Sequence, residues 1–143
     1  MTERLTVVDA AGRRKAYRPL PAATRAAALA DGLAAYDRGD FFEAHELLEP
    51  AWMGTDDPAE RALLQGLIKL AAAYVHDVRG NPTGMRKNLD GARARLVEGE
   101  PASDLVGIDA RDLVVAIDDR LSDLAAHRDG PTLPPPTLPR RAR

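Results

Sequence analysis

The sequence predicts an all-α fold, a compact single-domain bundle of about five helices. The chain has 143 residues, which suits one domain that builds its own core. Apolar residues recur at helical spacing in five segments, and capping residues, glycines and prolines separate these segments. Because aromatic residues make up only 4% of the chain, we expect a core of leucine, valine, isoleucine and alanine. The expected helices cover about residues 22–38, 41–52, 58–79, 82–98 and 110–128.

A glycine and an aspartate separate the first two helices. Leu29 and Tyr36 lie on one face of the first helix, and alanines fill the same face. Gly39 suits the position that ends a helix, and Asp40 suits the cap of the next one. Pro50 removes one backbone donor from the second helix, so this helix should bend or end within its last turn.

Each of the other three helices begins at a capping residue. Asp57 precedes Pro58, and Glu60 occupies the third helical position, a pattern that resembles a capping box. Asn81 repeats the cap-plus-proline signal for the fourth helix, and Asp109 caps the fifth. The caps and the apolar spacing therefore agree on where these helices begin.

The two ends of the chain are expected to lie outside the helical domain of residues 22–128. Residues 1–21 form an irregular N-terminal arm, in which residues 5–9 are either a short strand before a turn or an extended segment on the bundle. Residues 129–143 are rich in proline and arginine, with five prolines after residue 130. Proline cannot continue a helix, so we expect a disordered, solvated, polyproline-like tail.

Composition excludes several classes of protein. The formal net charge is −2, with both signs interspersed, so nothing indicates binding to nucleic acid or to an anionic membrane. The chain has no cysteine, which excludes disulfides, thiolate metal sites and cysteine nucleophiles. No apolar run is long enough to span a membrane, and the first residues lack a signal pattern, so a cytoplasmic location is expected.

One cluster of polar residues stands out as a candidate site. In the second helix, His45 and Glu49 are four residues apart and Glu46 lies beside them, so an imidazole and two carboxylates surround Trp52. In the third helix, Gln65 and His76 lie on a stripe separate from the apolar face, and Gly66 allows another helix to approach closely. The cluster therefore comprises His45, Glu46, Glu49, Trp52, Gln65, Gly66 and His76.

Three interpretations of this cluster remain open. In the first it is a buried polar network: Glu49 accepts a hydrogen bond from His45, Gln65 bonds to the polar groups that are still without a partner, and Trp52 covers the network. In the second it is a small-molecule pocket near Trp52 and His76. In the third His45, Glu49 and His76 bind a metal ion and Glu46 is a ligand or the general base of a hydrolase. His-Glu-x-x-Glu resembles the zinc motif H-E-x-x-H, but Glu49 replaces the second histidine.

The cluster residues belong to three linked motifs. These are Phe42-x-x-His45-Glu46-x-x-Glu49-x-x-Trp52, Gln65-Gly66-Leu67-Ile68-x-x-Ala71-Ala72-Ala73-x-x-His76, and Gly80-Asn81-x-x-Gly84. In this order they resemble the domain-of-unknown-function family 309 of small helical proteins from bacteria and archaea, over about residues 26–98. The resemblance implies a compact all-α fold, a cytosolic protein and a family pattern that contains the seven cluster residues. The resemblance implies no particular activity, cofactor or substrate.

The sequence does not specify a reaction. It contains no complete catalytic constellation and no phosphate-binding or nucleophile motif, so we lean against an enzyme. The expected function is a non-enzymatic interaction or scaffolding module that binds a protein partner or a second copy of itself. The alternatives are a small-molecule pocket and a metal-dependent hydrolase at the cluster. No cofactor is predicted, apart from the metal ion of the third interpretation.

Overall fold

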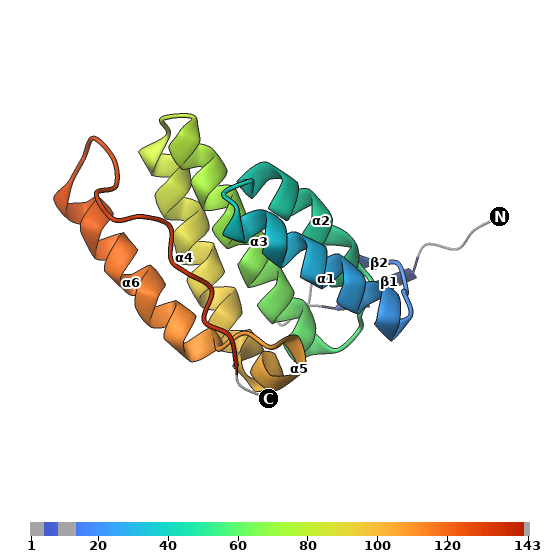
Figure 1. The fold of residues 1–143 in the computed structure, drawn as a ribbon. Helices are drawn as coiled ribbons and strands as arrows, with labels where there is room; N and C mark the ends of the chain where they lie inside the picture. The colour runs from blue at the N-terminus through green and yellow to red at the C-terminus, as the bar shows by residue number, and fades with distance from the viewer. Residues whose placement is uncertain (1–4, 9–13, 142–143) are drawn as a thin grey trace.

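The computed structural model describes residues 5–8 and 14–141, and it confirms an all-α bundle (Figure 1). Helix α1 packs on α2, α2 on α3, α3 on α4, and α4 on α6, so α3 lies in the middle of the row. No helix in this part of the chain is long and apolar enough to cross a membrane. The elements are β1 (Leu5–Val8), β2 (Arg14–Tyr17), α1 (Ala22–Asp37), α2 (Phe41–Met53), α3 (Pro58–Val78), α4 (Pro82–Gly99), the 3-10 turn η1 (Glu100–Ala102), α5 (Ser103–Val106) and α6 (Ala110–Ala126).

Helices α3 and α4 form the tightest pair because glycines let them approach closely. Leu96 of α4 packs against Gly66, where an added Cβ atom would lie 2.8 Å from Leu96 Cγ. Farther along, Gly99 lies against the backbone of Leu63. The expectation that Gly66 permits a close helix contact is therefore confirmed, with α4 as the neighbour.

The predicted caps of α3, α4 and α6 are confirmed by their hydrogen bonds. The side chain of Asp57 accepts from the amide of Glu60 at 2.9 Å, and Asn81 and Asp109 each accept from the amide three residues ahead. Asp40 does not cap α2 with its side chain. Asp40 does occupy the predicted N-cap position, but its carboxylate accepts from Arg38 Nε at 2.7 Å and makes no capping hydrogen bond.

Helix α2 ends at Met53, three residues after Pro50, within the last turn as predicted. The chain then leaves the helix at Gly54. Two backbone bonds attach the N-terminal segment to this exit, from the amide of Arg18 to the carbonyl of Met53 at 2.8 Å and from Leu20 to Gly54 at 3.2 Å. The N-terminal segment therefore runs beside the end of α2.

The N-terminal residues form a two-stranded antiparallel hairpin instead of an irregular arm. Leu5 pairs with Tyr17, and Val8 pairs with Arg14. Of the two predicted alternatives, the strand is the one observed. The turn expected after residue 8 lies outside the described residues.

The C-terminal segment is ordered against the bundle, so the predicted disordered tail at 129–143 is wrong for the residues that the structure describes. We call residues 131–141 the strap. In Figure 1 it returns from the end of α6 along the bundle toward α5. Pro136 and Leu138 are buried, Leu138 with only 4% of its surface exposed. The hydroxyl of Tyr36 donates to the carbonyl of Pro136 at 2.7 Å, which fixes the middle of the strap.

One carboxylate, that of Asp123, holds the beginning of the strap. It accepts from the backbone amide of Thr132 at 2.7 Å, from that of Leu133 at 3.0 Å, and from the Thr132 hydroxyl. The imidazole Nδ1 of His127 lies 3.1 Å from the same carboxylate. The hydrogen bonds from Thr132 and Leu133 lower the pKa of Asp123 to about 2.

The Asp123 contacts predict a specific loss of stability in acid. The pKa of this carboxyl is lower in the folded chain, about 2, than its ordinary value of 3.8, so its contribution is present above pH 3.8 and is lost as the pH falls toward 2. Asp123→Asn should therefore melt at a lower temperature than the parent at neutral pH. The difference between the two melting temperatures should become smaller as the pH falls toward 2, because the parent then loses the contribution of this carboxylate. Melting curves of both proteins between pH 6 and 2 measure this. A constant difference across that range would contradict the prediction.

Candidate functional site

The structure brings three of the predicted site residues together on one helix. His45, Glu46 and Glu49 of α2 each offer a ligand atom, and these atoms all lie within 4.8 Å of one another. The Nδ1 atom of His45 lies 3.3 Å from Oε1 of Glu46. The His45 and Glu46 side chains are 34% and 56% exposed, and Glu49 is half-buried, so the group, which we call the α2 triad, borders solvent.

The α2 triad is compact because of helix geometry. Residues four apart, such as His45 and Glu49, lie one above the other on a helix, and the long side chain of Glu46 reaches around from the next position. One imidazole nitrogen and two carboxylates are a donor set that suits zinc, manganese or iron. Because solvent reaches the triad, water can fill the remaining coordination positions.

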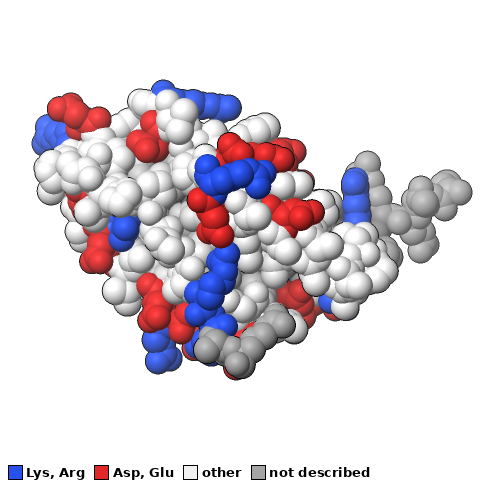
Figure 2. Space-filling view, in the orientation of Figure 1, with Lys and Arg blue, Asp and Glu red and all other residues white. Residues whose placement is uncertain are grey.

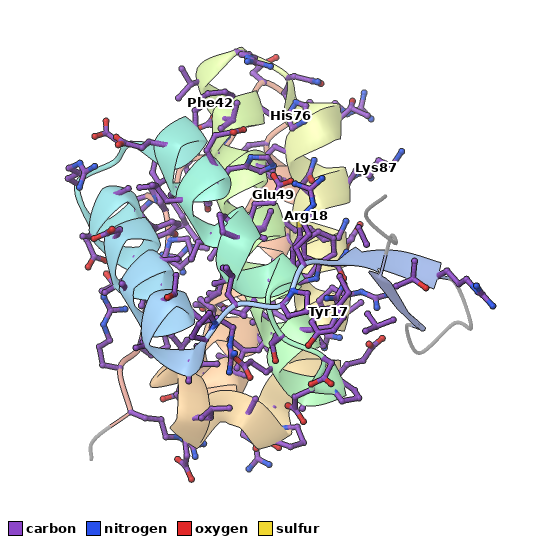
Figure 3. All side chains as sticks on the ribbon, turned by 90° about the vertical axis from the view of Figure 1, so that its right-hand side faces the viewer. Tyr17, Arg18, Phe42, Glu49, His76 and Lys87 are labelled. Carbon is purple, nitrogen blue, oxygen red and sulfur yellow. The ribbon has the colours of Figure 1, made fainter. Side chains whose placement is uncertain are left out.

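His76 lies at the far end of α3 and has a different neighbour. Its Nδ1 atom is 3.2 Å from Nδ2 of Asn81, the residue that caps α4. An added Cβ atom at Gly84 would lie 2.7 Å from the His76 ring, so the imidazole packs against the first turn of α4. Figure 3 shows Glu49 and His76 on the same side of the molecule, but the compact ligand group consists of α2 residues alone.

Trp52 and Arg61 form a structural contact at the junction of α2 and α3. The Arg61 guanidinium lies 5.0 Å from the centre of the Trp52 ring, and its Nη1 atom donates to the Trp52 carbonyl at 3.1 Å. The same guanidinium donates to the carbonyls of Thr55 and Ala16. Burial lowers the pKa of Arg61. Trp52 is half-buried, and its ring and carbonyl hold a cation that ties the hairpin to the bundle.

Gln65 and Gly66 occupy the first half of α3. Gln65 is half-buried, and Gly66 is buried beneath Leu96. Gly66 therefore serves the contact between α3 and α4. Its place in the motif is explained by packing alone, since a larger residue would separate the two helices.

Sequence reasoning missed a buried polar group beside the start of α3. The hydroxyl of Thr55 donates to Glu60 Oε2 at 3.0 Å, and Arg25 Nε lies 3.6 Å from the other oxygen of Glu60. Thr55, Glu60 and Arg61 are all buried. The signal in the sequence was the run of charged residues from Asp56 to Arg61. The cap pattern at Asp57 already accounted for these charges, so nothing suggested that Glu60 and Arg61 are buried.

A double-mutant cycle tests whether His45 and Glu46 support the fold. Both side chains are partly exposed, and exposed ion pairs contribute little, so we expect a coupling below about 0.5 kcal/mol between His45→Phe and Glu46→Gln. Urea unfolding of the parent, both single variants and the double variant measures it. A coupling above about 1 kcal/mol would mean that the triad is a structural network after all.

These features define a small helical-bundle protein with a His/Glu cluster at the edge of one helix. Residues 29–88 match the model of the family described as Domain of unknown function (DUF309), so this segment is similar to that family. The match covers the second half of α1, all of α2 and α3, and the beginning of α4, which confirms the resemblance that the three motifs indicated. A search of curated proteins finds no match to the chain.

Proposed function

We propose that this protein is a non-enzymatic interaction module that pairs with a second copy of itself. The observation that carries the proposal is an apolar surface where α2 begins and α3 ends. Phe42 is 61% exposed and Val78 is 80% exposed, and both line one groove of about 470 Å³. Large apolar side chains exposed side by side mark interaction surfaces more often than single ones do. We call this groove the Phe42 surface.

The charges around the Phe42 surface favour a second copy as the occupant. A twofold interface places the same patch on both subunits, so the patch must complement itself. On the α2 side, Arg38 pairs with Asp40 at 2.7 Å and with Glu43 at 3.0 Å, which leaves one net negative charge. On the α3 side, Arg79 lines the same groove. In a twofold pair, the basic α3 side of one copy faces the acidic α2 side of the other.

Sedimentation velocity across the micromolar range tests the self-association. The parent should change from monomer to dimer as its concentration rises, and Phe42→Ser should remain a monomer. Val115→Ser is the matched control, because Val115 is an apolar side chain of similar exposure, 59%, on α6. A parent that stays monomeric, or a Phe42→Ser variant that associates like the parent, would refute the proposal.

A second candidate function is metal binding at the α2 triad, and it is favoured by the close approach of the three ligand groups. His45, Glu46 and Glu49 would each supply one donor to a zinc or manganese ion, with water completing the coordination. In this arrangement Glu46 is a ligand, which leaves it unable to act as the general base of a hydrolase. The function would then be to hold the ion.

Isothermal titration with zinc, on protein purified without a histidine tag, tests the metal site. One equivalent should bind to the parent, and Glu49→Gln should weaken binding at least about tenfold, because losing even an outer-shell partner of a ligand costs about 10–100-fold in metal affinity. His127→Gln is the control, since His127 lies at the end of α6 with Asp123. Equal binding by the parent and Glu49→Gln, or no binding by the parent, would rule the site out.

A further inference from the structure

The strap lies between Tyr36 of α1 and Arg120 of α6 (Figure 1), and we call the surface of the bundle that it covers the groove. Its two buried side chains, Pro136 and Leu138, occupy the apolar middle of this groove. Tyr36 of α1 contacts it on one side and Arg120 of α6 on the other. The docked strap therefore brings Pro136 into contact with Tyr36, one hundred positions earlier in the chain.

The groove recognises the strap backbone through carbonyl groups. Arg120 Nε donates to the carbonyl of Pro134 at 3.1 Å, Tyr36 donates to that of Pro136 at 2.7 Å, and the amide of Asp109 donates to that of Pro139 at 2.8 Å. Proline has no amide proton, so a proline-rich segment offers mainly acceptors. The donors of the groove match this property.

Acidic side chains lie where the basic end of the strap docks. Arg140 Nη2 lies 2.9 Å from Asp37 of α1. Arg141 Nη1 lies 2.7 Å from Asp104, and its Nε lies 3.3 Å from Asp109. On the face drawn in Figure 2, basic and acidic side chains stand next to one another in this region. These three carboxylates belong to α1, to α5 and to the residue that caps α6. The folded bundle, and not the sequence next to the arginines, therefore supplies the acidic partners of the basic end.

We propose that the groove between α1 and α6 is a recognition site for extended, proline-rich segments that end in arginine. The strap sequence Pro136-Thr137-Leu138-Pro139-Arg140-Arg141 fills it within the chain, and a partner protein with a segment of the same chemistry binds by displacing the strap. A polyproline segment is already extended before it binds, so it loses little conformational entropy. This surface is separate from the Phe42 surface, so either proposal can fail without the other.

A cleavable full-length protein tests the groove directly. A specific protease site is inserted between Asp129 and Gly130, in the loop where His127, Arg128 and Asp129 are exposed. After cleavage of the folded protein, a fluorescent peptide with the sequence of residues 131–143 is added and its anisotropy is followed. The peptide should bind the cleaved protein by exchange with the strap and should bind the uncleaved protein at least tenfold more weakly, because the linked strap competes.

Peptide variants show whether the recognition is specific. A peptide with Leu138→Asp should bind at least tenfold more weakly, and one with both arginines replaced by alanine should bind more weakly and with less dependence on salt. As a second protein, the uncleaved Leu138→Asp variant should have an open groove and should bind the parent peptide. Circular dichroism accompanies each measurement. Failure of both proteins to bind the peptide would overturn the proposal. Loss of helical signal whenever the strap is released would also overturn it, because the bundle would then need its own strap in order to stay folded.

Discussion

Gly99→Ala is expected to lower the free energy of unfolding by about 3 kcal/mol, the upper range for a side chain forced into a packed core. An added Cβ atom at Gly99 would lie 2.6 Å from the Cα atom of Leu63. The obstacle is the backbone of α3, which cannot rotate away as a side chain can. Helices α3 and α4 would have to separate, and the buried side chains between them would lose contact. Urea unfolding of the parent and the variant measures the loss.

Gly91→Ala is the matched control in the same helix. There the added Cβ atom would lie 3.1 Å from Cδ of Lys69, a long side chain that can shift. Alanine also favours a helix over glycine by up to about 1 kcal/mol. We therefore expect Gly91→Ala to be neutral or stabilising. Equal losses in the two variants would show that close packing of the helix pair does not explain the effect at Gly99.

The helices could be predicted from the sequence because their signals are local. Asp57, Asn81 and Asp109 each bond to an amide three residues ahead, so the cap and its partner lie in one short segment. The failed cap at Asp40 shows the limit of this reasoning. The Arg38 guanidinium donates to the carboxylates of both Asp40 and Glu43, and sequence spacing does not reveal that Asp40 accepts from Arg38 and not from an amide of α2.

The sequence predicted correctly only the part of the candidate site that lies on a single helix, α2. His45, Glu46 and Glu49 converge because the period of the helix brings them together. His76 belongs to another helix, and its position depends on how α3 and α4 meet. That arrangement is set by small residues such as Gly84, against which His76 packs. Distances between helices depend on the whole core, and no local pattern contains them.

The strap was missed because composition says little about tertiary contacts. A segment with five prolines has few apolar side chains, and this favoured a solvated tail. Its order depends on groups elsewhere in the chain: the carboxylate of Asp123, the hydroxyl of Tyr36 and the amide of Asp109. Proline also reduces the conformational freedom that the unbound segment must lose, so few contacts are enough to hold it.

Leu138→Asp is expected to lower the free energy of unfolding by about 2–4 kcal/mol while leaving a folded bundle. Leu138 is 4% exposed and belongs to the main core cluster, and burying a leucine contributes about 1.5–3 kcal/mol. An unpaired carboxylate cannot occupy that position, so the middle of the strap detaches and its neighbouring hydrogen bonds are lost as well. Chemical unfolding measures the change in free energy, and hydrogen exchange at Arg141, whose amide bonds to the carbonyl of Gly107, reports detachment.

Leu133→Asp separates the loss of a buried side chain from the effect of a new charge on the strap. Leu133 lies on the same strap but is 38% exposed, and its amide still bonds to Asp123 after the substitution. We expect it to cost less than about 0.5–1 kcal/mol, as surface substitutions do. If Leu138→Asp is equally mild, the strap contributes little to stability and its docking is weak. If Leu138→Asp abolishes folding while Leu133→Asp does not, Leu138 is part of the core on which the bundle depends.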